Sequence, residues 1–312
     1  MQNMPIAIHT IEHDGARYVH AVVVGLFHAV VLAVALLRPA GICAGDSPTA
    51  AERPDETLPE AARPTPRPPE AQIRRWAGAG FWDRRHRAKL AEIAAGPKEY
   101  DCVFVGDSIT HNWEGWTEKP DVEAAERLYA NGGLKFPNGP GRAVWQEMRK
   151  KWRVLNLGMA GDSTQNVLWR LDHGELDGYR TRCVFLMIGT NNGRDTPENR
   201  ARGIKAILGK IAEKQPQATI LLSPIFPSGA RPDDPLRVSK DRTNSIIRGY
   251  ADGKRIVWVD FNSKFLNPDG TIIEALMPDC LHPLEEGYRI WFDAIKTSGV
   301  LPVHPQNAIP RR

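Results

Sequence analysis

Residues 101–110 read Asp-Cys-Val-Phe-Val-Gly-Asp-Ser-Ile-Thr, an apolar run that ends in a turn of small and polar residues. A short, continuous apolar run that closes on glycine is typical of a strand buried on both faces. Such strands belong to parallel sheets that helices cover on both sides. Four more runs of this form follow along the chain, at 153–157, 184–188, 219–222 and 256–259.

Helical patterns separate these apolar runs. In residues 197–214, Ile204, Ile207, Leu208 and Ile211 have helical spacing, and Pro197 suits a first helical turn. The alternation of strands and helices predicts an α/β fold with three layers, α/β/α, around a five-stranded parallel sheet. The other helices are expected at 71–95, where aromatic residues indicate a lead-in helix or two, and at 164–171, 236–251 and 285–297.

The N-terminal 45 residues differ from this pattern. Residues 19–37 are apolar except for two histidines, and as a helix they would span roughly 28 Å, about one bilayer core. Arg17 precedes the run and small residues follow it, so residues 1–45 are interpreted as a signal peptide or an uncleaved membrane anchor. A buried core helix would be amphipathic and embedded among other elements. We therefore expect export, to the periplasm, the extracellular space or a membrane-anchored position.

Residues 46–70 are rich in proline, alanine and glutamate and contain no aromatic residue. Such a composition buries too little apolar surface to order itself. The sequence therefore predicts a disordered, extended linker at 46–70 and a folded domain at 71–312. Within that domain, the long connection 112–140 is rich in Gly, Pro and Trp and is expected to be an insertion near the functional site.

Composition argues against several classes of protein. The 41 Lys and Arg nearly balance the 37 Asp and Glu, giving a net charge of +4 over 312 residues, so there is no electrostatic case for a nucleic-acid partner. Four cysteines are too few for a disulfide scaffold and have no zinc-ligand spacing. Cys102 and Cys183 open apolar runs and are expected to be buried thiols. No metal and no cofactor is expected.

The residues that follow each strand are the ones to examine, because ligands of an open parallel sheet bind beyond the carboxyl ends of its strands. Three turns of small residues and one Asp-x-x-His loop are expected at this edge of the sheet. They are Gly106-Asp107-Ser108-Ile109-Thr110, Gly158 to Ser163, Gly189-Thr190-Asn191-Asn192-Gly193 and Asp279-Cys280-Leu281-His282-Pro283.

These four segments together contain the parts that acyl transfer requires: a nucleophile, a base, a group that orients the base, and donors for the oxyanion. Ser108 is the candidate nucleophile, His282 the base, and Asp279 the residue that orients it. The candidate oxyanion donors are the backbone N–H groups of Ser108 and Gly161 and the side-chain amide of Asn191. Asp107 is expected to brace the turn rather than to react.

The segments also resemble those of the SGNH, or GDSL-type, hydrolase superfamily, from about residue 101 to residue 294. The matching motifs are Gly106-Asp107-Ser108, Gly161, Gly189-Thr190-Asn191 and Asp279-Cys280-Leu281-His282. Residues 156–171 are similar to the branch that contains the platelet-activating-factor acetylhydrolase catalytic subunits and many bacterial esterases. The resemblance implies a flavodoxin-like fold and ester hydrolysis without metal or cofactor. One departure is Asn192, where relatives often carry Asp.

The substrate is left open by the sequence. An exported enzyme with aromatic residues in its insertion (Trp113, Trp116, Tyr129 and Phe136) suits removal of short acyl groups, above all acetyl, from O-acetylated carbohydrate. These aromatic residues could equally pack the insertion itself. A lipid acyl ester is the second candidate. A noncatalytic surface-binding module is a third, although such a module need not keep all four segments. A metal-dependent phosphatase or nuclease would instead require clustered carboxylates and histidines at the strand ends.

Overall fold

The computed structural model describes residues 8–13, 16–21, 60–67, 80–117, 121–123 and 137–301. It divides into a unit at 1–51 and a unit at 52–312. In the first unit, β1 (Ile8–His13) pairs antiparallel with β2 (Ala16–Ala21). Residues 19–21 of the apolar segment are therefore in a strand, while 22–37 lie outside the described residues. In the part of the chain that the structure describes, no helix is both long and apolar enough to span a membrane.

The second unit is built on a five-stranded parallel sheet, as the sequence predicts. Its strands lie in the order β4-β3-β5-β6-β7. The chain forms β3 first, then places β4 beside it at the edge of the sheet, and adds the remaining strands on the other side of β3. This is the flavodoxin-like strand order, whose switch point, between β3 and β5, is where ligands bind in such sheets. The strands are β3 (Glu99–Gly106), β4 (Val154–Gly158), β5 (Arg180–Met187), β6 (Thr219–Leu222) and β7 (Ile256–Trp258).

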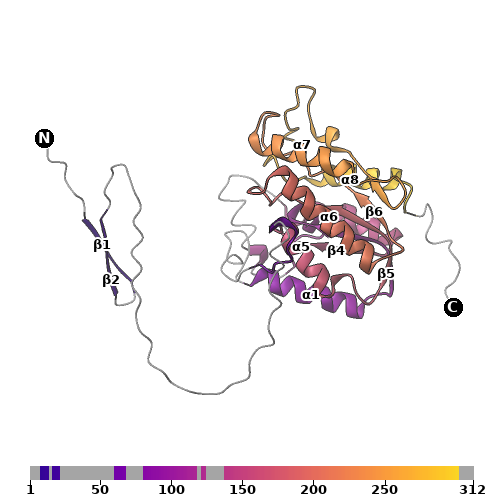
Figure 1. Cartoon of the computed structure of the whole chain (residues 1–312), viewed down its shortest axis with the longest axis horizontal. Coiled ribbons are helices and arrows are strands. Elements are labelled where there is room, and N and C mark those ends of the chain that lie inside the picture. Colours follow the sequence, from indigo (N-terminus) through magenta and orange to yellow (C-terminus); the bar gives the residue numbers. More distant parts are fainter. Residues whose placement is uncertain are drawn as a thin grey trace, which may run out of the picture. The chain divides into compact units, whose positions relative to one another are not determined.

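The strands bury side chains on both faces because successive residues point to opposite sides. Val103 and Val105 pack in one core with side chains of α5 (Thr164–Arg170), α6 (Pro197–Lys214) and α7 (Pro235–Arg248), which lie side by side (Figure 1). Phe104 packs in the other core, against α4 (Arg142–Lys151) and α8 (Glu285–Thr297). Cys102 and Cys183, paired in register and both free, are fully buried in this second core, as predicted.

Local signals place the helix ends. Thr196 caps α6 by accepting a hydrogen bond from the backbone N–H of Asn199, and Pro197 occupies the first turn. Asp234 caps α7 in the same way through Leu236 N–H. The other helical elements are α1 (Phe81–Ala95), α2 (Ser108–His111), the π-helix η3 (Leu171–Glu175), and the short 3₁₀ helices η1 (Glu60–Ala62) and η4 (Asn262–Phe265).

The prediction of a disordered linker at 46–70 is wrong for residues 60–67. Ala61 and Ala62 are buried, and the carbonyl of Ala61 accepts a hydrogen bond of 2.7 Å from Thr164 Oγ1. Thr65 N–H donates to the carbonyl of Gln165 at 3.1 Å. The segment is ordered because α5 and α6 supply the apolar contacts and hydrogen-bond partners that its own composition lacks. Residues 46–59 and 68–70 lie outside the described residues.

Candidate active site

The carboxyl ends of the three adjacent strands β4, β3 and β5 lie at the same level of the sheet. Gly106 of β3 pairs in register with Gly158 of β4 and Met187 of β5. A Cβ on Gly106 would lie 2.4 Å from the carbonyl oxygen of Met187, and one on Gly158 would lie 2.3 Å from the backbone nitrogen of His111. Both positions therefore require glycine, because the neighbouring strand β5 at Gly106 and helix α2 at Gly158 leave no room for a side chain.

Ser108 is the first residue of α2, the short helix that follows β3. Asp107 caps this helix, since its buried Oδ1 accepts a hydrogen bond of 3.0 Å from Ile109 N–H. The hydroxyl of Tyr288 in α8 donates to the carbonyl of Ile109 at 2.7 Å. The turn, the cap and α8 together fix the backbone that carries the Ser108 hydroxyl. Asp107 thus has the bracing position that the sequence analysis expects.

Ser108, His282 and Asp279 meet in the folded structure although Ser108 and His282 are 174 residues apart. Ser108 Oγ lies 2.9 Å from His282 Nε2, and His282 Nδ1 lies 2.6 Å from Asp279 Oδ2. An ionised carboxylate can only accept, so Nδ1 carries the proton and Nε2 keeps a lone pair toward the hydroxyl. The histidine and aspartate side chains are 14% and 17% exposed, so the array is accessible from solvent.

The loop that carries Asp279 and His282 has a tight local geometry. Asp279 Oδ1 accepts hydrogen bonds from the backbone N–H groups of Leu281, at 3.0 Å, and His282, at 2.7 Å. Between them, Cys280 adopts a positive φ of 54°, which is uncommon for a residue other than glycine. The carbonyl of Cys280 accepts a hydrogen bond of 3.1 Å from Gly229 N–H. This turn brings the side chains of Asp279 and His282, three residues apart, into hydrogen-bond contact.

The electrostatics around the nucleophile follow from burial. Burial alone would raise the pKa of Asp279, but the hydrogen bonds from the His282 ring and from the loop backbone hold that pKa below its ordinary value. Asp107 lies deeper, and burial raises its pKa to about 6. Burial lowers the pKa of Lys240, whose charge acts on Asp107, to about 8. Asp279 is therefore ionised at neutral pH, whereas Asp107 gains a proton under mildly acidic conditions.

The loops after β4 and β5 meet at Asp162. Asn191 Nδ2 donates a hydrogen bond of 2.8 Å to the carbonyl of Asp162, next to Gly161. Gly161 has a φ of +79°, a left-handed backbone conformation that glycine adopts readily and other residues rarely do. Gly161 and Asn191, predicted as oxyanion donors, are thus brought together on neighbouring loops.

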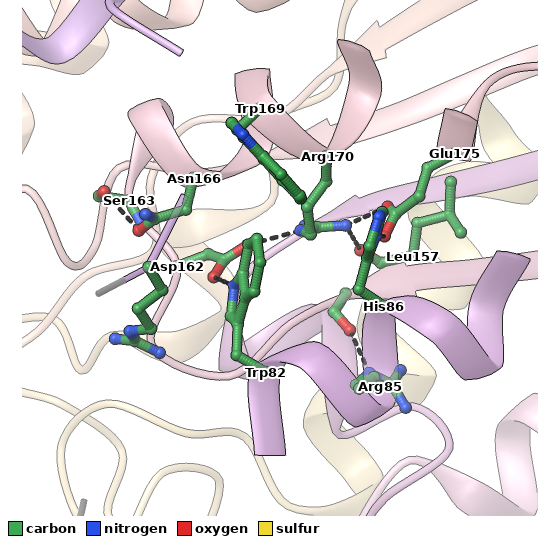
Figure 2. A network of polar contacts seen from close by, with 12 residues as sticks. Trp82, Arg85, His86, Leu157, Asp162, Ser163, Asn166, Trp169, Arg170 and Glu175 are labelled. Atoms are coloured by element: carbon green, nitrogen blue, oxygen red, sulfur yellow. Dashed lines mark hydrogen bonds and ion pairs between the residues drawn. The ribbon is translucent and has the colours of Figure 1, made fainter. Parts of the chain in front are cut away.

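A buried polar network holds the side chain of Asp162, the residue at which these loops meet (Figure 2). Asp162 accepts hydrogen bonds from Trp82 Nε1, at 2.7 Å, and Arg170 Nε, at 2.8 Å. Arg170 also forms an ion pair with Glu175, whose other oxygen lies 2.8 Å from His86 Nδ1. Arg170, Asp162 and Glu175 are fully buried. Sequence analysis missed this network; the charged Arg170 within the apolar pattern of residues 164–171 was the available signal.

Asn192, the departure from the family pattern, lies beside the site and has a structural role. Its Oδ1 accepts a hydrogen bond of 3.0 Å from Thr164 N–H, and its Nδ2 donates to Asp195 Oδ2 at 2.8 Å. An amide satisfies both partners at once, whereas an ionised aspartate could not donate to Asp195.

Two of the aromatic residues in the insertion are internal. Trp113 is fully buried and Trp116 is 7% exposed. Trp113 packs on Tyr288 and Trp291, and Trp116 on Phe81 and His111, so neither presents an open face to a sugar ring. The packing alternative therefore holds for these two, while Tyr129 and Phe136 lie outside the described residues. Within the described ranges, no group of three His, Cys, Asp or Glu side chains could hold a metal ion.

The fold and the site define a class: an α/β protein with a Ser-His-Asp array at the switch point of a flavodoxin-like sheet. Residues 104–290 match the model of the GDSL-like lipase/acylhydrolase family, and the chain belongs to that family. It is therefore a carboxylic ester hydrolase.

Three similar proteins illustrate this relationship. The chain is 33% identical to platelet-activating factor acetylhydrolase IB subunit alpha1 of Bos taurus over 232 residues, 73% of this chain and 84% of that protein. It is 35% identical to subunit alpha2 of Rattus norvegicus over 212 residues, 68% and 80% of the two chains. A solved structure from Streptococcus pneumonia, provisionally named a platelet activating factor, shares the fold with a TM-score of 0.51 and 19% identity, over 70% of this chain and 92% of that one.

Proposed function

We propose that the chain hydrolyses short acyl esters, acetyl esters above all, through Ser108 as a covalent nucleophile. The observation that carries the proposal is the pair of short contacts at His282: Ser108 Oγ at 2.9 Å and Asp279 Oδ2 at 2.6 Å. A hydroxyl with a base in hydrogen-bond reach, itself oriented by a carboxylate, is the arrangement that activates serine.

The reaction runs in two steps. His282 Nε2 takes the Ser108 proton as Oγ bonds to the acyl carbon, and the same proton passes to the alcohol oxygen as its bond to the acyl carbon breaks. Water then gives a proton to His282 and attacks the acyl-enzyme. The carboxylic acid leaves and the proton returns to Ser108. Asp279 holds the ring in the required tautomer and stabilises the imidazolium.

The oxyanion that forms in each step is bound by three donors: the N–H groups of Ser108 and Gly161 and the side-chain amide of Asn191. The hydrogen bond from Asn191 to the carbonyl of Asp162 supports this assignment, since it fixes the plane of the amide beside Gly161. Donors that are held in place before the reaction lower the barrier without reorganisation.

The acyl group is proposed to be acetyl. Over 73% and 68% of this chain, 33% and 35% of the aligned residues are identical to those of proteins that are named acetylhydrolases. For the alcohol half of the ester, the sequence suggests O-acetylated carbohydrate, an inference that rested partly on aromatic residues. With Trp113 and Trp116 buried, this inference rests on expected export and on Tyr129 and Phe136, which lie outside the described residues.

An acetylated lipid is the second candidate, and a surface feature favours it. Leu236 and Val238, in the first turn of α7, are 54% and 38% exposed. A Cβ on Gly193, two residues after Asn191, would lie 3.9 Å from Leu236 Cδ2. An apolar side chain therefore borders the loop that carries Asn191, where it would contact the apolar part of a lipid ester.

The location of this activity is proposed from the N-terminal segment. Residues 1–45 would direct the chain out of the cytoplasm, either as a cleaved signal peptide or as a membrane tether through 19–37. N-terminal sequencing of the exported protein would separate the two.

A panel of acetyl esters tests the substrate proposal. Release of acetate would be measured from p-nitrophenyl acetate, an acetylated glycerolipid, acetylated xylan and an acetylated sialic acid, with His282→Ala as the inactive control. Preference for p-nitrophenyl acetate over the octanoate supports the acetyl assignment. Acetate from the glycerolipid alone supports the lipid candidate, and acetate from xylan or sialic acid supports the carbohydrate. A noncatalytic module would release acetate from none of them.

A further inference from the structure

An ordered segment outside the family match contacts the proposed oxyanion donor. Residues 60–67, here called the N-terminal strap, precede the matched range of 104–290. The strap is bound to α5 by three hydrogen bonds, two of which involve Thr65: its N–H donates to the carbonyl of Gln165, and its carbonyl accepts from Asn166 Nδ2 at 3.1 Å. A Cβ on Gly203 of α6 would lie 2.4 Å from the carbonyl of Ala61, so the strap also packs closely against α6.

The strap ends at Arg67, whose guanidinium reaches the loop after β4. Arg67 donates a hydrogen bond of 3.0 Å to the carbonyl of Ala160 and one of 2.7 Å to the carbonyl of Gly161. Its residue exposure is only 7%, and its charge also acts on the buried carboxylate of Asp162. One planar side chain thus holds two consecutive peptide groups, a geometry that suits the forked donors of arginine.

This contact determines the direction of the Gly161 N–H. The Ala160 carbonyl and the Gly161 N–H belong to the same planar peptide, and the described residues contain no cis bond. In a trans peptide these two groups point in opposite directions. Arg67 therefore fixes the N–H by holding the carbonyl, and the second hydrogen bond fixes the following peptide. The neighbouring contacts, from Asp162 N–H to the carbonyl of Met159 at 3.2 Å and from Asn191 to the carbonyl of Asp162, hold the residues that follow, whereas Arg67 holds the peptide that carries the Gly161 N–H.

We propose that Arg67 is a positioning residue for catalysis, which orients the Gly161 N–H toward the oxyanion. The inference rests on the proposed role of Gly161 in ester hydrolysis. It assigns a function in the reaction to a proline-rich segment upstream of the family's matched range.

The test compares Arg67→Ala with a control that loses the same kind of contact elsewhere. Arg255 donates to the carbonyls of Ala212, at 3.0 Å, and Gln215, at 3.4 Å, beside the amino end of β7 and therefore at the opposite end of the sheet. The full-length wild type, Arg67→Ala, Arg67→Lys and Arg255→Ala would be assayed for kcat and KM on p-nitrophenyl acetate. Thermal unfolding would be measured on the same preparations.

Arg67→Ala is expected to lower kcat by about 10- to 100-fold, below the loss of about 10²- to 10³-fold for removing an oxyanion donor outright, because the N–H is misdirected and not deleted. KM should change by less than about threefold, because ground-state contacts with the substrate remain. The kcat of Arg67→Lys should lie between those of the wild type and Arg67→Ala, since a lysine ammonium cannot form the paired hydrogen bonds of a planar guanidinium. Millimolar methylguanidinium should restore part of the kcat of Arg67→Ala.

Arg255→Ala should keep the wild-type kcat with a similar fall in melting temperature. Equal kcat values for Arg67→Ala and wild type, together with an inactive Ser108→Ala, would overturn the role of Arg67 but leave the proposed function intact. Equal losses of kcat in the Arg67 and Arg255 variants would also overturn it, because the effect would then be global. Full activity of Ser108→Ala would overturn the proposed function itself.

Discussion

Asn191 Nδ2 donates a hydrogen bond of 2.8 Å to the carbonyl oxygen of Asp162, joining the loop after β5 to the loop after β4. An amide nitrogen carries two hydrogens, so this bond orients the second N–H of Asn191 without consuming it. The two proposed side-by-side oxyanion donors, Gly161 and Asn191, are thus part of one rigid unit.

The first prediction concerns that amide. Asn191→Ala should lower kcat by about 10²- to 10³-fold with little change in KM, because the lost hydrogen bond forms fully only in the transition state. Steady-state kinetics on p-nitrophenyl acetate would measure it. The exposed Asn267, whose amide bonds Thr271, provides a matched control, and Asn267→Ala should leave kcat unchanged. A rise in KM at constant kcat would instead assign Asn191 to substrate binding.

Asp279→Asn should reduce kcat by about 10³- to 10⁴-fold. The amide would favour the tautomer of His282 that carries its proton on Nε2 and cannot accept from Ser108. Because the pKa of Asp279 lies below its ordinary value, the wild-type orientation should persist to below about pH 4 and be lost only as pH falls further. Asp269→Asn is the control, since Asp269 forms a similar exposed turn at Thr271. Similar kcat for Asp279→Asn and Asp269→Asn would exclude this role.

Burial of Asp107 makes a prediction about stability. Its pKa is about 6 in the folded chain and 3.8 ordinarily, so between these values the folded state binds more protons than the unfolded state. The contribution of Asp107 to the unfolding free energy is therefore full below about pH 4 and is lost as pH rises through about 6. The loss amounts to about 3 kcal/mol. Asp107→Asn keeps the oxygen that caps Ile109 and removes the buried charge.

Urea denaturation at two pH values tests this linkage. Asp107→Asn should be more stable than wild type by about 3 kcal/mol at pH 8 and nearly equal to it at pH 4. A stability difference that is the same at both pH values would show that the carboxyl group does not titrate in this range.

The buried network yields a further prediction. Arg170→Leu should lower the unfolding free energy by about 3–5 kcal/mol, because it leaves the carboxylates of Asp162 and Glu175 buried without their cation. Arg289→Leu removes an ion pair with Glu147 in which both side chains are over a third exposed, and should cost about 1 kcal/mol or less. Denaturant unfolding of the two variants measures the contrast. Equal losses would mean that Asp162 and Glu175 take up protons when Arg170 is removed.

The fold was predictable because its signals are local. Each strand contains a mostly apolar run, and α6 begins at Pro197 and ends at Lys214 as predicted, since proline and the spacing of Ile204 and Ile207 act within a few turns. Helix α4 was not assigned, because only Val144, Trp145 and Met148 mark its buried face and no side chain caps it.

The core of the site was also predictable, because the strand-end rule places Ser108 and His282 at the same edge of the sheet. The contacts that surround these catalytic residues depend on partners distant in sequence. The docking of Arg67 cannot be inferred from a proline-rich segment, since its stabilising contacts come from α5, α6 and the loop at 160–161. Likewise, composition does not distinguish a tryptophan that packs internally, such as Trp113, from one that binds a ligand.

Labelling with a fluorophosphonate, followed by peptide mapping, tests the central claim most directly. Ester hydrolysis through an activated serine predicts one label per chain, on Ser108 Oγ, with labelling abolished in Ser108→Ala and slowed at least 10³-fold in His282→Ala. Label on a different residue, or a Ser108→Ala protein that hydrolyses p-nitrophenyl acetate at the wild-type rate, would contradict the account.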